Sequence, residues 1–364
     1  MLKIKEGYAY FYFCFDIAEE IKLEKLEKVL GTTPRQFKLE GKRLSPDYMQ
    51  YRVPPLFVRL GAIATRFNER TITSILDIKL YDFGAITIRF QVPLKGTLED
   101  LEKFSSLAEE KDIFEKEAKE FLSKLKDELS EYLVKPEKKN DYIETYTIFS
   151  VRKFDKKISA KELYNRNWKT IAKIIKQEVE RMSDEELKDT VKNPFSYYED
   201  DIVIVDWNGA FIYDTTKSYD VIDVIEYAVI ELLELRAYDN YLDKALDQAY
   251  DDIEKRKQSW IISPFVGTFN NLLHTQIEVS EVVEKVENSL KLIGDPYLAK
   301  VYTIAANRFY LDRWKLSIKN KLEVVERTYE GLSNRINNAR MIILELLIVL
   351  LFIADLILIY YVGG

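Results

Sequence analysis

The C-terminal stretch MIILELLIVLLFIADLILIYYV, Met341 to Val362, decides the architecture predicted for this chain of 364 residues. As a helix rising ~1.5 Å per residue it would span roughly 33 Å, enough to cross a hydrocarbon core of about 30 Å. A helix buried in a soluble core is the alternative, but such helices rarely stay apolar on every side for so long. Tyr360 and Tyr361 stand at the far end, where membrane proteins place an aromatic belt. We therefore expect one C-terminal transmembrane helix over 341–362.

The residues before this span set its expected orientation. Four basic side chains lie on the near side, Lys321, Arg327, Arg335 and Arg340. The positive-inside rule then keeps residues 1–340 in the cytoplasm, with the protein in the cell membrane as a single-pass chain. The apolar stretch near the N-terminus, 8–15, is too short and too soon followed by an acid to act as a signal peptide, so we interpret it as a buried strand.

Two carboxylic acids, Glu345 and Asp355, interrupt the predicted span. Carboxylic acids inside a membrane cost about 3 kcal/mol each and usually face water or a partner helix. Glu345 lies near the interface and can reach headgroup water, whereas Asp355 is deeper. Two interpretations of Asp355 stay open: a protonated acid that needs no partner, and a contact between subunits of a homo-oligomer.

The composition excludes several kinds of site. The chain has one cysteine, Cys14, and one histidine, His274, among 54 basic and 61 acidic residues with a net charge of -7. An intramolecular disulfide, a cysteine zinc site and a multi-histidine metal site are therefore ruled out. No glycine-rich phosphate loop is present, and the acidic runs 199–201 and 251–252 are more typical of solvated surfaces than of cation sites. We expect no enzyme activity, no catalytic or metal-binding residue and no cofactor. Abundant Lys, Glu, Ile and Tyr suit a thermophilic archaeal source.

The order of the predicted elements indicates an α+β fold. A strand, a helix, a β-hairpin and a helix follow one another twice, which suggests two ferredoxin-like β-α-β-β-α layers produced by an internal duplication. Both hairpins turn through an Asp, an aromatic residue and a Gly. Chance similarity among short apolar strands is the alternative. The elements expected in the first copy are 8–15, 17–30, 72–92 and 98–134, and those in the second are 142–151, 160–181, 201–213 and a long helix from 220, with Ser183 as the N-cap of a short helix from 184.

The predicted domains follow from this order. They are a first α/β subdomain at 1–140 with an irregular basic segment at 31–72, a second at 141–219, a helical stalk at 220–340, and the transmembrane helix. Apolar residues of the stalk recur every three or four positions from Leu311 to Ala339, as in a coiled coil. This stripe can pack on the preceding helices of one chain or on copies of itself, and we expect a homo-oligomer.

The segment 31–72 combines eight basic with three acidic residues and several aromatic ones. Such a mixture can bind RNA through phosphates and base stacking, or bind anionic lipid headgroups. The alternative is a surface loop whose arginines pair with acidic helices. The candidate polyanion-binding residues are Arg35, Lys38, Lys42, Arg43, Arg52 and Arg59.

The C-terminal half resembles a known family, the required-for-meiotic-nuclear-division family, over residues 195–364. The matching residues are Tyr302, Arg313, Lys321, Leu322, Leu344, Glu345 and Asp355, with the Asp206–Ala210 hairpin as a less specific match. Leu346 departs from the pattern, because family members have an aromatic residue there. The resemblance implies a C-terminally anchored membrane protein with a soluble α/β head and no catalytic residues. Its mitochondrial members support translation at the inner membrane, which implies a ribosome or another RNA-containing assembly as partner.

A second resemblance concerns architecture. An α/β domain, long helices and the SNRIN stretch, 333–337, before a span look like the CorA magnesium channels. CorA channels need a Gly-Met-Asn loop and a second span, and the sequence has neither. We therefore predict a non-enzymatic membrane-anchored scaffold, with an oligomeric transport- or channel-like subunit built around Asp355 as the alternative.

Overall fold

The computed structural model describes residues 2–30, 41–43, 53–67, 70–110, 113–136, 142–178, 180–216, 218–255, 270, 273–274, 276–277, 279–280 and 294–362. The chain divides into two compact units. The first unit comprises residues 1–237 and 288–312, and the second comprises residues 238–287 and 313–364.

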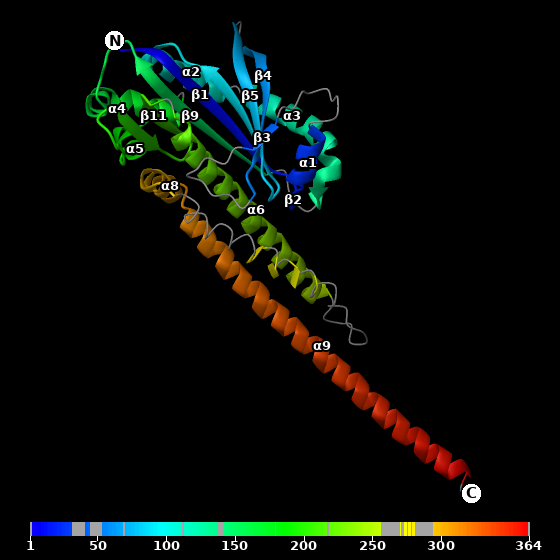
Figure 1. The fold of residues 1–364 in the computed structure, drawn as a ribbon. Coiled ribbons are helices and arrows are strands. Elements are labelled where there is room, and N and C mark those ends of the chain that lie inside the picture. The colour runs from blue at the N-terminus through cyan, green and yellow to red at the C-terminus, as the bar shows by residue number, and fades with distance from the viewer. Residues whose placement is uncertain are drawn as a thin grey trace. The chain divides into compact units, whose positions relative to one another are not determined.

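One mixed sheet dominates the first unit (Figure 1). Its strands run in the order β10-β11-β9-β1-β6-β5-β4-β3, and the short β7 pairs with the start of β1. The strands are β1 (Lys3–Asp16), β3 (Gly41–Arg43), β4 (Leu56–Phe67), β5 (Arg70–Leu80), β6 (Ala85–Pro93), β7 (Gly96–Thr97), β9 (Tyr142–Phe154), β10 (Asp201–Val205) and β11 (Gly209–Asp214). A separate two-stranded sheet joins β2 (Glu20–Ile21) to β8 (Leu133–Val134).

Helices alternate with these strands along the chain. They are α1 (Leu23–Leu30), α2 (Leu98–Glu110), α3 (Ile113–Leu129), the 3₁₀ turn η1 (Ser130–Tyr132), α4 (Ala160–Lys176), α5 (Asp184–Thr190), α6 (Asp220–Lys255), α8 (Pro296–Arg308) and α9 (Leu311–Val362). The sequence encodes several of their ends. Ser159 and Ser183 cap α4 and α5, each accepting a hydrogen bond from the backbone N–H three residues on, so the predicted cap at Ser183 is confirmed.

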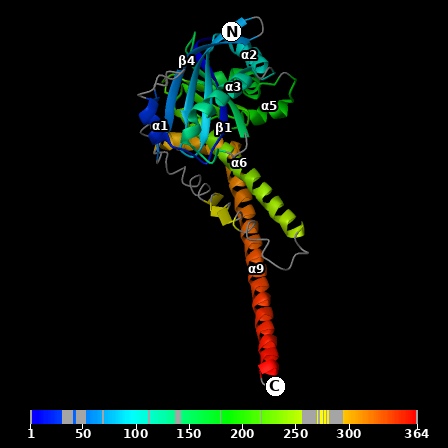
Figure 2. The same cartoon turned by 90° about the vertical axis from the view of Figure 1, so that its right-hand side faces the viewer.

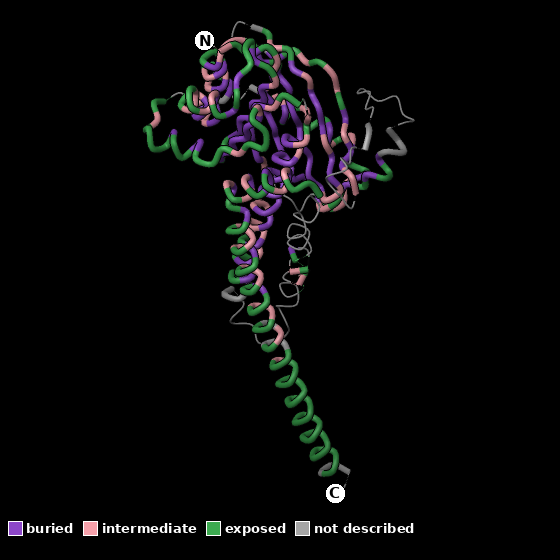
Figure 3. The backbone as a smooth tube through the Cα atoms, turned by 60° about the vertical axis from the view of Figure 1, so that its left-hand side comes forward, coloured by how far each residue is buried: buried purple, intermediate pink, exposed green. Residues whose placement is uncertain are grey.

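The central strand β1 serves two different faces because successive side chains point to opposite sides of a sheet. Phe11, Phe13 and Phe15 belong to the main apolar core, together with residues of α2, α3 and α4. Tyr10 and Tyr12 point to the other face, which α6 crosses. Figure 2 shows α2 and α3 beside the sheet, and Figure 3 shows that most buried residues gather in the part of the chain that contains the sheet. One face of the sheet is therefore apolar, while the other carries the polar side chains described below.

The second predicted α/β layer is present as β9-α4-β10-β11. β11 pairs parallel with β9, and β10 pairs antiparallel with β11, which is the arrangement of a ferredoxin-like half. The first layer differs: β6 pairs antiparallel with β1, and β3 to β6 form an antiparallel meander. The two halves also share one sheet, since β1 pairs with β9 from Ile4 to Asp16. The boundary predicted at 140/141 thus lies between two strands that pair directly.

The expectation of an irregular segment over 31–72 is wrong for residues 56–67. These residues form β4, one of the longest strands, and β5 begins at Arg70. Pro54 and Pro55 lie just before the first residue of β4, so they do not interrupt the hydrogen bonds of the strand. A register shift between Arg59 and Gly61, with Gly61 at a φ of 101°, accommodates one extra residue.

Helix α9 carries the apolar C-terminal segment. Residues Asn337–Ile359 are long and apolar enough to cross a membrane, with a mean hydropathy of 3.1 and none of the segment buried in the protein. Earlier in the same helix, Ile318 and Val325 are fully buried within the single chain. That part of the heptad-like stripe therefore packs on the chain itself.

Candidate functional site

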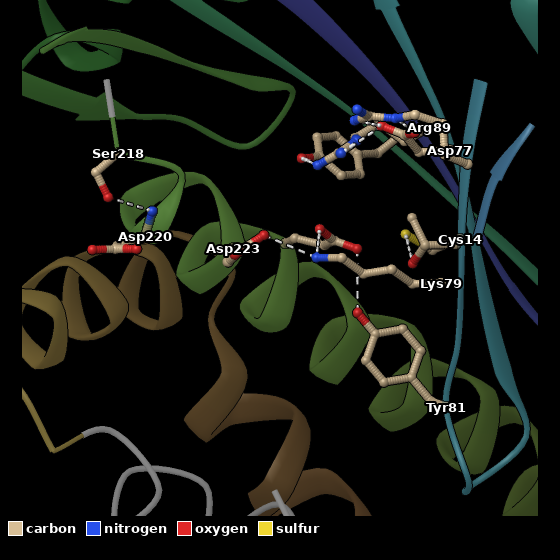
Figure 4. Close-up of polar contacts among 12 residues, drawn as sticks. Cys14, Asp77, Lys79, Tyr81, Arg89, Ser218, Asp220 and Asp223 are labelled. Atoms are coloured by element: carbon tan, nitrogen blue, oxygen red, sulfur yellow. Dashed lines mark hydrogen bonds and ion pairs between the residues drawn. The ribbon is translucent and has the colours of Figure 1, made fainter. Parts of the chain in front are cut away.

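The face of the sheet crossed by α6 carries a buried polar layer. Asp77 and Lys79 lie on β5, and Arg89 lies opposite Asp77 on β6. Because Asp77 and Lys79 are two residues apart, they point to the same side of the sheet. Figure 4 shows these side chains between the strands and the first turns of α6.

The first half of this layer is an ion pair between Asp77 and Arg89. Asp77 is 1% exposed and accepts a hydrogen bond from Arg89 Nη2 at 2.7 Å and another from Arg59 Nε at 2.8 Å. The Arg89 guanidinium carbon also lies 5.4 Å from the ring centre of Tyr10, as in a cation–π contact. Burial would lower the pKa of Arg89, but Tyr12 and Asp77 together raise it well above its usual value. Arg89 is therefore a buried permanent cation held by a buried carboxylate.

The second half of the layer joins the sheet to α6. Lys79 Nζ donates to Asp223 at 2.9 Å and to Glu226 at 2.7 Å, and the Tyr81 hydroxyl donates to Glu226 at 3.2 Å. Burial disfavours the charged lysine, but Asp223 and Glu226 more than offset this and raise its pKa. Lys79 and Tyr81 thus hold two carboxylates of α6, and these contacts fix the start of α6 on the sheet.

Cys14 lies beside this layer. The thiol is fully buried and contacts the Thr87 hydroxyl at 3.6 Å. Burial raises the pKa of the thiol, so the reactive thiolate form is suppressed at neutral pH. Cys14 is therefore a packed side chain rather than a nucleophile.

A second buried carboxylate, Asp206, lies in the turn between β10 and β11. It is fully buried, forms an ion pair with Arg308 of α8, and lies 3.1 Å from Lys176 Nζ of α4. The Tyr146 hydroxyl donates to the Asp206 carbonyl at 2.9 Å. Arg308 also pairs with Asp189 of α5 at 2.9 Å. One turn thus gathers α4, α5 and α8 around a single buried acid.

The same turn contacts the start of α9. Phe309 packs edge-on against Tyr146 at 5.4 Å and against Trp207 at 6.3 Å between ring centres. Tyr310 has a φ of 54°, and α9 begins at the next residue. Within the first unit, Phe309 is therefore packed against both β9 and the Asp206 turn.

Three of the six predicted polyanion-binding residues lie on the described strands β3 and β4, which pair with each other. Arg35, Lys38 and Arg52 lie outside the described residues. Lys42 and Arg43 lie on β3, and Arg59 on β4 pairs with Asp77. Arg59 keeps half of its side chain exposed.

The residues of the predicted family motif have distinct surroundings. Tyr302 is buried and its hydroxyl donates to Glu231 of α6. In the second unit, Lys321 pairs with Asp239 at 2.9 Å and with Asp243 at 2.7 Å. Arg313 is exposed, Leu322 is half-buried, and Leu344, Glu345 and Asp355 are exposed on α9.

Among the described residues, no group of three or more His, Cys, Asp or Glu side chains could hold a metal ion. Asp201, from the acidic run 199–201, instead accepts hydrogen bonds from the backbone N–H groups of Tyr197 and Tyr198. His274 is exposed.

The sequence interpretation missed Asp77, Lys79, Arg89 and Asp206. A signal for the first three was present, since charged residues two apart within apolar strands point to one face. Asp206 was assigned to a turn, but its burial depends on α8, which follows about ninety residues later.

Comparisons with known proteins place the chain in a family. A family model described as "Uncharacterized protein MJ0711, N-terminal domain" matches residues 6–220, more than half of the chain. The chain therefore belongs to this family. The uncharacterized protein MJ0711 of Methanocaldococcus jannaschii is 25% identical over 240 residues, which cover 66% of this chain and 72% of that protein. No solved structure matches the chain.

Proposed function

We propose that this member of the MJ0711 N-terminal domain family is a membrane-anchored scaffold. A single C-terminal span would hold the sheet-containing unit at the cytoplasmic surface, where it would recruit a partner. The role would need no chemistry from the chain.

One observation carries the proposal. Residues Asn337–Ile359 form a continuous apolar helix of which nothing is buried in the protein. Exposing so many large apolar side chains to water is unfavourable by about 25 cal/mol per Å², and a bilayer removes this cost.

The orientation can be tested by cysteine labelling in intact cells. The native Cys14 is fully buried, so it should not react with a membrane-impermeant maleimide. Lys161→Cys places a thiol on exposed α4, and Gly363→Cys places one beyond the span. We expect Gly363→Cys to react in intact cells and Lys161→Cys to react only after lysis. Labelling of Lys161→Cys in intact cells would contradict a cytoplasmic head.

The nature of the partner rests on the resemblance to the meiotic-nuclear-division family and on the basic segment. Both favour a ribosome or another RNA-containing assembly, with anionic lipid as the alternative. Substituting Arg35, Arg43 and Arg52 by Glu should weaken binding of the full chain to RNA or to anionic vesicles, and wild-type binding should fall steeply with salt. Arg59→Glu alone should have less effect on binding, because Arg59 already pairs with Asp77. Salt-independent binding, or none, would refute this part of the proposal.

A further inference from the structure

β9 is an inner strand of the sheet, but its first residues have a described neighbouring strand on one side only. β9 starts at Tyr142, but β11 begins to pair with it only at Thr147. Residues Tyr142 to Tyr146 therefore pair with β1 on one side and with no described strand on the other. These five residues present roughly 17 Å of free edge at ~3.4 Å per residue.

The backbone groups along this edge have a defined direction. Thr147 donates its N–H to the Asn208 carbonyl, away from β1. In an antiparallel pair, alternate residues direct both of their backbone groups to the same side. The N–H and C=O groups of Ile143 and Thr145 therefore point to the open edge as well. An edge of this kind is a template for another strand, and proteins usually cover it.

A cavity of about 290 Å³ follows this edge. On one face of the sheet it is bounded by the aromatic side chains Phe11, Phe13 and Phe114. On the other face it is bounded by Glu144 and Arg236, which form an ion pair. The cavity thus has an apolar side and a charged side, separated by the plane of the sheet.

One polar group in the cavity lacks a partner. Gln177, the left-handed C-cap of α4, is 3% exposed, and its Nε2 donates to the Asn208 carbonyl at 3.4 Å. Its buried Oε1 atom has no hydrogen-bond partner among the described residues. Leaving such an acceptor unpaired is unfavourable, and a donor that enters the cavity would relieve this cost.

We propose that the open edge of β9 binds an extended polypeptide segment of a partner protein, which adds to the sheet in line with β11. Backbone donors and acceptors spaced along a strand are matched by another extended chain. The two sides of the cavity select an alternating segment, with apolar side chains toward Phe11, Phe13 and Phe114 and polar side chains toward Glu144 and Arg236. The proposal deepens the scaffold role by naming how the partner is held.

The test uses the full chain in mild detergent and a six-residue peptide of alternating valine and lysine, labelled with a fluorophore. We expect saturable binding by anisotropy, together with slower hydrogen exchange of the Ile143 and Thr145 amides. The matched control is the same peptide N-methylated on alternate amides, in two versions that differ in which amides are blocked. One version should bind at least tenfold more weakly than the unmodified peptide, because it cannot donate to the strand edge.

Two protein variants separate backbone from side-chain recognition. Thr145→Pro removes an N–H that the ladder to β1 does not use, whereas Thr145→Val keeps it. Proline should abolish peptide binding and valine should preserve it, and Gln177→Met should weaken it several-fold.

Equal binding of all three peptides to the wild-type chain would overturn the proposal, and this comparison does not require any variant to fold. Absence of binding at about 1 mM peptide would also overturn it. Peptide binding that leaves the exchange of the Ile143 and Thr145 amides unchanged would overturn it as well, because the peptide would then not lie along the strand edge. Peptide binding with the predicted N-methyl effect in a chain that lacks the apolar span would support this site even if the membrane role failed.

Discussion

Removing the buried Asp77 carboxylate should cost far more stability than removing both members of its ion pair. In Asp77→Leu the Arg89 guanidinium stays buried, with 7% of its side chain exposed, and loses its acid. Breaking a buried pair from one side typically costs about 3–5 kcal/mol. In Asp77→Leu/Arg89→Met both charges are gone and the volume is largely kept, so the loss should be within about 1 kcal/mol of wild type.

Arg59 provides a matched control on the same carboxylate. It donates to Asp77 at 2.8 Å, but half of its side chain is exposed. Solvent screens such a pair, so Arg59→Met should cost at most about 1 kcal/mol.

Thermal unfolding followed by near-UV circular dichroism, on the full chain in mild detergent, measures these differences. At roughly 2–4 °C per kcal/mol for a unit of this size, Asp77→Leu should lower Tm by about 6–20 °C and Arg59→Met by less than about 4 °C. The double variant should recover most of the loss. A double variant that loses as much as Asp77→Leu, or more, would refute the claim that an orphaned Arg89 is the cause.

Three further predictions test other parts of the structure. Gly84→Ala should lower the free energy of unfolding by more than about 3 kcal/mol in chemical denaturation, because an added Cβ would lie 1.7 Å from the Ala18 carbonyl oxygen. At Gly61 an added Cβ meets open space, so Gly61→Ala should cost only ~1–2 kcal/mol of backbone strain. Burial alone would raise the pKa of Tyr219, but hydrogen bonding with Arg152 lowers this pKa below the usual value. Ionised Tyr219 therefore stabilises the fold at alkaline pH, and this contribution is lost as the pH falls through the lowered pKa. In a spectroscopic titration the earliest phenolate step should disappear in Tyr219→Phe and stay in Tyr297→Phe, because the Tyr297 hydroxyl has a raised pKa. If Asp355 joins subunits, Asp355→Leu should weaken oligomers by roughly 0.6 kcal/mol per contact and Asp355→Asn should preserve them, as measured by light scattering in detergent. A wild-type chain that is monomeric in both detergent and lipid would contradict the oligomer hypothesis.

Some features of the fold were predictable because local patterns determine them. The apolar run near the C-terminus, the Ser183 cap and the hairpin at the Asp206 turn depend on neighbouring residues, and all three are present. The β9-α4-β10-β11 unit was likewise visible in the order of its elements.

The remainder depends on pairing between distant segments. The alternation of apolar and polar residues within a strand does not specify whether the neighbouring strand is parallel or antiparallel. The sequence therefore did not show that β6 pairs antiparallel with β1 whereas β11 pairs parallel with β9. The buried acids belong to the same class. Asp77 and Asp206 resemble surface residues in the sequence, and only the approach of Arg89 and of Arg308 makes their burial favourable. The many basic residues of 31–72 were visible in the sequence, but the ion pair between Arg59 and the buried Asp77 was not.

The measurement that tests the membrane anchor most directly is alkaline carbonate extraction of native membranes. It compares the full chain, a chain ending before Asn337, and a full chain carrying Leu350→Arg and Leu351→Arg within the apolar helix. The full chain should stay in the membrane pellet, the shortened chain should appear in the soluble fraction, and the double arginine variant should be extracted, because each arginine at the centre of a span costs about 2.5–3.5 kcal/mol. A shortened chain that remains in the washed membranes, or a full chain that is released from them, would contradict the account.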